Sequence, residues 1–271
     1  MLRLYDIYHP AFNSRPFKCK SEKNMPFRPQ RLNSVLIQKL DAFLKANSFP
    51  DLYRAYAWNK DTYENDFPDI HRLELHIATM DQTTGITISD VKCVAKWGGN
   101  WRNQGRIAGR AGRTVVLPPH TLHTPEGAAV AQLQDEPLAP LLKLDASVTQ
   151  AGPTYLTKVL RFGLPQEYGA IDTRCVRVFG CGNAEIRQQD WIALRARNNG
   201  SGWFIVADKA WPEEYATWIN ILRYFASQLP ANCPHPRPFV AARLRTAGGW
   251  ECADVEMALF SYASQFAGRG A

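Results

Sequence analysis

The segment TYLTKVLRFGLPQEYGAIDTRCVRVFG, residues 154–180, places a lysine and an aspartate at the starts of two consecutive short helices. Apolar residues recur with helical spacing through its first half, and this pattern puts Lys158 on the first turn of the first helix. Gly163 is typical of the end of such a helix. The segment therefore predicts two helices, and their arrangement decides what Lys158 and Asp172 can do.

Asp172 is expected at the N-cap of the second helix, because a side-chain oxygen there accepts hydrogen bonds from the first backbone N–H groups. Gly180 stands where a residue in the left-handed conformation ends a helix. A helix of seven residues rises about 10 Å, and the connection Pro165–Ile171 can span up to about 23 Å if it is extended. The chain can therefore return to its starting level, which allows Lys158 and Asp172 to be neighbours.

An amine beside a carboxylate suits covalent chemistry at an electrophilic carbon. A partly buried lysine can attack such a carbon and form a Schiff base, while a nearby carboxylate takes its proton or stabilises a developing cation. The alternative is structural: Asp172 caps its helix and Lys158 is a solvated residue of the first turn. The spacing by itself leaves both interpretations open.

The residues around this pair resemble the helix-hairpin-helix DNA glycosylases of the 8-oxoguanine glycosylase type. In that family a Lys-Val at one helix start is followed by Val-Asp-Thr-His at the next, and Thr157–Val159 and Ala170–Arg174 stand in those places here. The resemblance implies that Lys158 attacks the sugar C1′ and that Asp172 accepts its proton and stabilises the cation. It also implies that a base is flipped out of duplex DNA, at a cost of a few kcal/mol that stacking offsets.

The chain departs from the family pattern just before the lysine. The family has a hairpin with two glycines there, whereas this chain offers Gly152 and Pro153, and its segment from Lys158 to Asp172 is shorter than usual. An alignment that keeps the usual separation puts Thr154 in the place of the lysine. In that case the resemblance implies a glycosylase that uses water and forms no Schiff base.

Two further stretches resemble the same family, in the same order along the chain. Residues Arg102–Gly109 (RNQGRIAG) are similar to the loop that fills the gap left by the extruded base, and Ala258–Ser261 (ALFS) to the last helix, whose Phe packs on that base. We assign DNA binding to this loop and the basic residues after it, namely Arg102, Asn103, Gln104, Arg106, Arg110 and Arg113. We assign the base pocket to Trp97, Trp101, Glu256 and Phe260.

These assignments have structural alternatives. The basic residues can form a solvated loop, and each of the three aromatic residues can belong to the hydrophobic core. By alignment on Phe260, Glu256 stands where relatives that read 8-oxoguanine carry a glutamine. A glutamate accepts hydrogen bonds but does not donate them, so it suits a base that presents an amino group, such as cytosine or a derivative of it.

The composition agrees with a globular protein that binds a polyanion. A length of 271 residues with 45% hydrophobic residues predicts a substantial core. The net charge of +7 favours a polyanionic partner, although ribosome-associated, membrane-surface and simply basic proteins share it. The distribution is more informative, because Lys92–Arg113 carries several basic and no acidic residues, with Trp97 and Trp101 between them.

The six cysteines show neither a CxxC motif nor a closely spaced framework. They predict reduced thiols in a cytoplasmic protein, and Cys233 and His235 with Cys252 are too sparse a set to predict zinc. We therefore expect no metal and no cofactor. The N-terminus lacks the apolar core of a signal peptide, and no apolar run is long enough to span a membrane.

The sequence predicts a mostly α-helical fold of two interleaved helical lobes of the DNA glycosylase type, with one β-hairpin at about residues 190–208. Residues 1–31 are expected to form an N-terminal arm, and residues 32–271 the glycosylase-like domain. We expect a monomer that binds double-stranded DNA and excises either an oxidised purine, in repair, or a hypermodified base of invading phage DNA, in defence. The alternative is a catalytically silent module of the same fold that binds DNA or a modified base.

Overall fold

The computed structural model of the chain describes residues 32–80, 84–99, 104–117, 128–183, 188–200 and 202–267. Within these residues the protein is mostly α-helical, which confirms the predicted class. The helices are α1 Ser34–Ala46, α2 Phe49–Arg54, α3 Pro68–Ala78, α4 Ile88–Trp97, α5 Ala128–Asp135, α6 Ala139–Ser147, α7 Pro153–Gly163, α8 Thr173–Phe179, α9 Glu213–Gln228, α10 Arg237–Ala241 and α11 Cys252–Phe266.

The strands of the described residues are short and pair as antiparallel two-stranded sheets, β1 with β2, β3 with β5, β4 with β6 and β7 with β8. Their bounds are β1 Ala57–Trp58, β2 Asp61–Thr62, β3 Ile86–Thr87, β4 Ala108–Gly109, β5 Val115–Leu117, β6 Val148–Thr149, β7 Ala196–Asn198 and β8 Trp203–Ile205. Each pair fixes a connection between helices rather than forming a layer of the fold.

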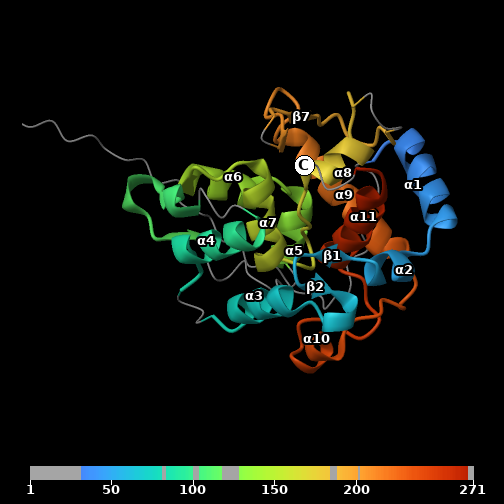
Figure 1. Cartoon of the computed structure of the whole chain (residues 1–271), viewed down its shortest axis with the longest axis horizontal. Helices are drawn as coiled ribbons and strands as arrows, with labels where there is room; N and C mark the ends of the chain where they lie inside the picture. The colour runs from blue at the N-terminus through green and yellow to red at the C-terminus, as the bar shows by residue number, and fades with distance from the viewer. Residues whose placement is uncertain are drawn as a thin grey trace, which may run out of the picture.

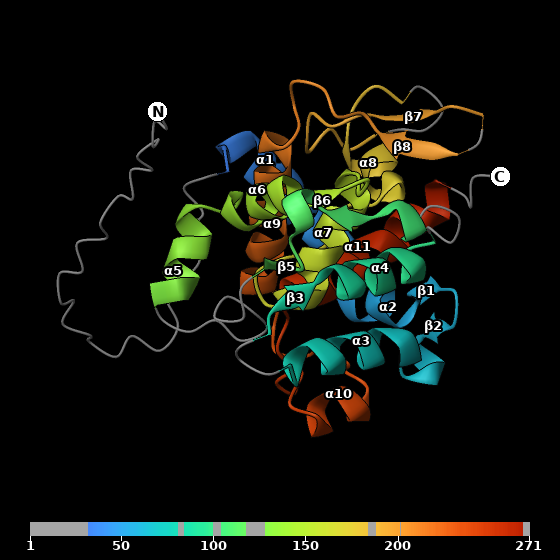
Figure 2. The same ribbon diagram turned by 90° about the vertical axis from the view of Figure 1, so that its left-hand side faces the viewer.

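The helices form two groups that meet at α7. Figure 1 shows α3, α4 and α6 on one side of the molecule and α1, α2, α8, α9 and α11 on the other, with α7 between them. Helix α7 packs against α3, α4 and α6, and α11 packs against α2, α8 and α9. Because α7 also contacts α11, both groups contribute to one continuous hydrophobic cluster. In both views the β7–β8 hairpin lies at one end of the molecule, beside α8 (Figures 1 and 2).

Helix α7 is buried along most of its length. Gly152 is its N-cap and Pro153 its first residue, where the missing N–H of proline costs no hydrogen bond. Every residue of the helix from Leu156 to Gly163 is buried. The sequence pattern placed Lys158 on the first turn, and this is wrong: the helix starts earlier, at the proline, so Lys158 lies on the second turn inside the protein.

Helix α8 begins as the sequence predicts but ends differently. Asp172 is its N-cap, and its side chain accepts a hydrogen bond from the backbone N–H of Arg174. Gly180 is not left-handed, because its φ is −86°. A glycine is required there for a different reason, since an added Cβ would lie 2.3 Å from the carbonyl oxygen of Leu194 and 2.4 Å from that of Val176.

Three other helix boundaries follow from local signals. Helix α4 starts with a capping box in which Thr87 and Asp90 bond each other's backbone N–H groups. The sequence predicts a closing helix from about Cys252 to Phe266, and α11 has these bounds. The sequence predicts a helix that starts with Pro212, since proline is common at the first helical position. In the structure Pro212 is instead the N-cap of α9, with a ψ near 0°.

The predicted hairpin at about residues 190–208 is present but shorter. Strands β7 and β8 pair through Ala196–Ile205, Arg197–Phe204 and Asn198–Trp203. Residues 191–195 are not in a strand, and Trp191 there stacks on Phe179 at 4.4 Å between ring centroids. Packing of this segment onto the core therefore replaces its pairing with a second strand.

Two of the sequence predictions concern the ends of the chain and the membrane. The predicted arm, residues 1–31, lies outside the described residues. Among the helices that the structure describes, each is too short or too polar to cross a bilayer.

Candidate functional site

A cleft of about 510 Å³ opens where α7, α8 and the β7–β8 hairpin meet. Its walls come from β1, the end of α4, the first turns of α7 and α8, and the hairpin. The lining residues are Trp58, Gly98, Gly152, Pro153, Thr154, Tyr155, Lys158, Asp172, Thr173, Arg174, Arg177, Asn199, Gly202, Trp203, Phe204 and Ile205. Its volume is in the range typical of sites for small organic ligands.

Lys158 and Asp172 meet at this cleft. The Nζ of Lys158 lies 3.3 Å from Oδ2 of Asp172, and both side chains are largely buried. The preceding residues bring the two helices together, because the hydroxyl of Thr157 accepts a hydrogen bond from the N–H of Ile171 at 3.2 Å. Thr157 and Ile171 each precede a member of the pair, so this bond places the amine beside the carboxylate.

The connection between α7 and α8 is held from α9. The Oη of Tyr215 donates to the carbonyl of Gly169 at 3.0 Å, and Nε1 of Trp218 donates to the carbonyl of Ala170 at 3.0 Å. All of these residues are buried. The position of Asp172 is therefore set by rigid packing rather than by a mobile loop.

The charge state of Asp172 follows from its neighbours. Burial by itself raises the pKa of the Asp172 carboxyl, but the ammonium of Lys158 and the N–H of Arg174 outweigh burial, so the pKa lies below its usual value. Asp172 is therefore an anion across the neutral range. The site presents an amine and a fixed negative charge on the same side of the cleft.

Aromatic rings surround the amine. The Nζ of Lys158 lies 5.3 Å from the ring centroid of Trp58, 5.6 Å from that of Trp97 and 5.9 Å from that of Tyr155. Each distance is within the range of a cation–π interaction. Trp97, which the sequence assigned to the base pocket, is buried, and its Nε1 donates to Asp61 Oδ2 at 2.7 Å.

Phe260, also assigned to the base pocket, is buried beneath Arg174. The Cζ of Arg174 lies 5.0 Å from the ring centroid of Phe260 and 5.2 Å from that of Trp58. Phe260 also packs against Tyr56, with 5.4 Å between ring centroids. In this arrangement the guanidinium of Arg174, and not the ring of Phe260, faces the cleft.

Glu256 lies on α11 behind the cleft wall and is buried. Its Oε2 is 4.0 Å from Nε of Arg161, and its Cβ lies against Gly169, where an added Cβ would approach it to 2.7 Å. Burial raises the pKa of Glu256 to about 7, although Arg161 and Lys158 act in the opposite direction. A substantial fraction of this carboxyl is therefore protonated at neutral pH.

Glu256→Gln is expected to make the protein more stable at pH 8 and to change its stability little at pH 4. The folded-state pKa of about 7 lies above the unfolded value of about 4.3, so the parent loses stability as the pH rises between these values. At roughly 1.4 kcal/mol per pKa unit, a difference of about 2.7 units gives the variant about 3–4 kcal/mol at pH 8. Urea unfolding at both pH values measures this, and a variant less stable than the parent at pH 8 would contradict it.

The predicted DNA-binding residues are described only in part. Arg102, Asn103 and Trp101 lie outside the described residues, and the other four are at or near the surface. Nε of Arg110 donates to the carbonyl oxygens of Asp145 and Val148, and Arg113 donates to the hydroxyl of Ser147. These bonds tie the basic segment, defined here as Gln104–Arg113, to the end of α6.

The basic segment lies close to the cleft. Its strand β4 pairs with β6, with Ala108 opposite Thr149 and Gly109 opposite Val148. The chain passes from β6 directly to Gly152, which lines the cleft. The β4–β6 pair therefore connects the backbone of the basic segment to the wall of the cleft.

Some residues of the cleft were not predicted from the sequence. Trp58, Arg174 and Trp203 line it, and Arg177 lies over the ring of Trp203 at 3.9 Å. A single aromatic residue in a segment without periodicity carries no signal that separates a cleft wall from a core position. Arg174 had such a signal, since it directly follows the Asp-Thr of the family motif.

A buried network of ion pairs lies beneath the site. Glu74 of α3 bonds Arg161 of α7, and it accepts two hydrogen bonds from Arg245, at 2.7 and 3.1 Å. Arg245 also donates to Asp254 of α11 at 3.0 Å. These four side chains are buried, and Arg161 is one turn after Lys158 on α7. The network thus joins α3, α7 and α11 directly below the amine.

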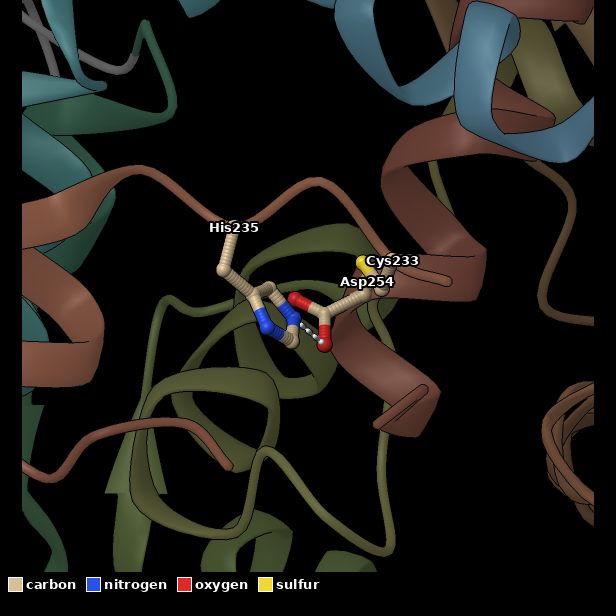
Figure 3. A group of neighbouring side chains, drawn as sticks. All are labelled: Cys233, His235 and Asp254. Carbon is tan, nitrogen blue, oxygen red and sulfur yellow. Dashed lines mark hydrogen bonds and ion pairs between the residues drawn. The ribbon is translucent and has the colours of Figure 1, made fainter. Parts of the chain in front are cut away.

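Cys233, His235 and Asp254 form a cluster beside this network (Figure 3). Their potential ligand atoms lie within 4.8 Å of one another and are of the types that zinc prefers. However, Arg245 already engages both oxygens of Asp254, and Nε2 of His235 lies 3.1 Å from one of them. Burial also raises the pKa of the Cys233 thiol, whereas a metal binds the thiolate. We therefore assign the cluster to the ion-pair network.

The cleft thus combines an amine, an ionised carboxylate, an aromatic surround and an arginine that faces the opening. Such a set can form a Schiff base with an electrophilic carbon and can hold an anionic group beside it. A scan against protein-family models, a search of curated proteins and a search of solved structures each returned no match to this chain.

Proposed function

We propose that the protein is a DNA glycosylase that cleaves the N-glycosidic bond of a base flipped from duplex DNA. The observation that carries this proposal is the buried pair of Lys158 and Asp172, 3.3 Å apart, at the wall of a cleft. An isolated buried lysine is costly, and here the buried lysine is paired with Asp172 and lines the cleft. A lysine with only a structural role on a helix surface would instead be exposed to solvent.

The proposed reaction uses the two groups in succession. The ammonium of Lys158 passes a proton to Asp172, and the neutral Nζ attacks C1′ as the bond from C1′ to the base nitrogen breaks. The departing base takes up the proton from Asp172, whose restored carboxylate stabilises the positive charge at the sugar. Transfer of a proton from Nζ to O4′, as the bond from C1′ to O4′ breaks and the sugar ring opens, then gives the protonated Schiff base.

Arg174 supports a substrate that carries phosphate. Its guanidinium faces the cleft and, within the described part of the chain, makes contacts with aromatic rings but no hydrogen bond or ion pair. An arginine in this state retains all its donors for a bidentate anion. A nucleotide phosphate next to the flipped base fits this requirement.

The basic segment supports a duplex partner, because its strand β4 pairs with β6 and the chain leads from β6 to Gly152 in the cleft wall. Arg106 is exposed, and its side chain has no hydrogen-bond or ion-pair partner among the described residues. Phosphate contacts of this type contribute affinity that depends on salt but not on base sequence. The extrusion of one base would then occur at the cleft, with the flanking phosphates on the basic segment.

Arg106→Ala is expected to weaken binding to all duplexes alike. The slope of log K against log salt should fall by about one unit, because one phosphate contact is lost. Binding isotherms at several salt concentrations measure the slope. Arg54→Ala, which removes an exposed arginine of α2, is the control and should leave the slope unchanged. An unchanged slope for Arg106→Ala would place the basic segment outside the interface.

Two substrate classes remain in competition within this function. An oxidised purine would fit a repair enzyme, and a hypermodified base of phage DNA would fit a defence enzyme. The cleft continues from the Lys158–Asp172 pair to Asn199, Trp203 and Phe204 of the hairpin, so it extends well beyond the reacting atoms. This length favours a base with an additional substituent over a base of ordinary size.

The second candidate function is a catalytically silent module that binds DNA or a modified base. The observation in its favour is that Arg174 covers Phe260 and Trp58, the rings on which a base would stack. One experiment separates the two candidates: incubation with duplexes that carry oxidised, deaminated or hypermodified bases, followed by borohydride reduction. Base release with a covalent adduct supports the glycosylase, and tight binding without release on every duplex supports the silent module.

A further inference from the structure

Gly98, at the end of α4, lies against the side chain of Lys158. A Cβ added at Gly98 would be 3.1 Å from Cδ and 3.3 Å from Nζ of Lys158, and 3.3 Å from Cε1 of Tyr155. Its φ is −70°, which any residue adopts, so the backbone does not require a glycine there. The small size of Gly98 is instead what leaves room for the lysine.

Trp58 approaches the same amine from the other side. Its Nε1 donates to the carbonyl of Trp97 at 2.9 Å, and Nε1 of Trp97 donates to Asp61 at 2.7 Å. Asp61 is fully buried and accepts hydrogen bonds from the first N–H groups of α3, at 2.8 and 3.1 Å. The indole of Trp58 is therefore held through a chain of hydrogen bonds that ends in a helix terminus.

We propose that Gly98 and Trp58 are positioning residues that fix where the amine of Lys158 lies, and so which atom in the cleft it can attack. Gly98 leaves the room that the side chain of Lys158 occupies, because any Cβ there would come within 3.1 Å of it, and Trp58 holds the charged nitrogen by a cation–π interaction. The Schiff base is also a cation at the same nitrogen. The ring of Trp58 therefore stabilises the covalent intermediate as well as the resting ammonium.

The catalytic part of this inference rests on the proposed function. The variant Gly98→Ala tests whether Gly98 affects the reaction of Lys158. The added methyl group shifts the amine by a few tenths of an ångström. Because reaction rates depend steeply on the alignment of reacting atoms, the rate of adduct formation should fall by about tenfold, with unchanged DNA affinity. Gly249→Ala is the matched control, since Gly249 is not among the residues that line the cleft and an added Cβ there meets only ordinary contacts, at 3.5 and 3.8 Å.

Trp58→Leu and Trp58→Phe separate positioning from folding. Leucine removes the ring and should lower the yield of the borohydride adduct, whereas phenylalanine keeps a ring and should restore part of it. Thermal unfolding of each variant shows whether the fold is intact. Equal loss in the Leu and Phe variants, or a rate for Gly98→Ala equal to that of Gly249→Ala, would overturn the positioning role.

A measurement on the resting protein keeps this inference independent of activity. In protein labelled with ¹³C at lysine Cε, the signal lost in Lys158→Gln identifies Lys158. Ring currents should place that signal apart from those of the other lysines, and it should move towards them in Trp58→Leu and shift in Gly98→Ala. If no duplex yields either an adduct or base release, the proposed function fails; a Lys158 signal that neither variant changes would refute the positioning itself.

Discussion

Lys158→Gln is expected to abolish the covalent adduct and to lower base release by roughly 10³-fold or more, because the variant loses a nucleophile with a high effective concentration at its target. Glutamine keeps most of the side-chain volume and cannot form a Schiff base. The expected loss concerns the chemical step, so affinity for the duplex should stay close to that of the parent. Single-turnover base release and borohydride trapping measure the two effects separately.

Two matched variants accompany this prediction. Lys45→Gln removes an exposed lysine of α1 and should trap as well as the parent. Asp172→Asn removes the charge but keeps a side-chain oxygen that caps α8, so it should lower release by about 10²- to 10⁴-fold without unfolding the helix. An adduct that survives Lys158→Gln would mean that another amine is the nucleophile.

Base release without any adduct would have a different meaning. It would agree with the alternative alignment in which Thr154 replaces the lysine of the family motif, and with water as the nucleophile. Thr154 lines the cleft on the first turn of α7, so a water activated by Asp172 has space beside it. Release that still depends on Asp172 but not on Lys158 is the result that identifies this route.

Glu74→Gln is expected to destabilise the protein by about 3–5 kcal/mol, because it leaves two buried arginines without their shared carboxylate. Glu74 is fully buried between Arg161 and Arg245 and bonds both. The midpoint of urea unfolding should fall while its slope stays constant. Asp51→Asn, which breaks the exposed pair with Arg54, is the control and should change stability by less than about 1 kcal/mol.

The difference between Glu74→Gln and the parent should also depend on pH. Burial raises the pKa of Glu74, but Arg245 and Arg161 outweigh burial, so the folded-state pKa lies below the unfolded value of about 4.3. The charge of Glu74 therefore contributes its full stability above the unfolded pKa, and this contribution is lost as the pH falls towards the folded-state pKa. A difference that stays constant down to pH 3 would contradict the network as its source.

Parts of the fold and site follow from local sequence signals. Helix α11 has the predicted bounds, because its apolar residues and the acidic residues at its start are local features. The approach of Lys158 to Asp172 follows from the lengths of α7 and its connection, as expected. The start of α7 was misplaced because Pro153, a residue often found outside helices, is the first residue of this one.

Other features depend on contacts between distant residues and leave no local signal. Glu74 lies in an amphipathic helix, where a charge usually indicates a solvated face, but its partner Arg245 is far along the chain. Gly180 is expected to be left-handed because glycine often is at a helix end. The close approach of the Leu194 carbonyl, which leaves no room for a Cβ at position 180, exists only in the folded chain. Trp58 belongs to the site only because β1 brings it beside α4 and α8.

Arg174 covers the rings that a planar ligand needs, with its Cζ 5.2 Å from the centroid of Trp58 and 5.0 Å from that of Phe260. Any group that stacks on these rings first has to displace the guanidinium. The side chain of Arg174 therefore competes with such a group for the two rings. A cation–π contact worth about 0.5–2 kcal/mol lowers the affinity of every stacking ligand by roughly 2- to 30-fold. Groups that stack more weakly than the guanidinium do not displace it. Arg174 therefore restricts binding on these rings to groups that stack more strongly.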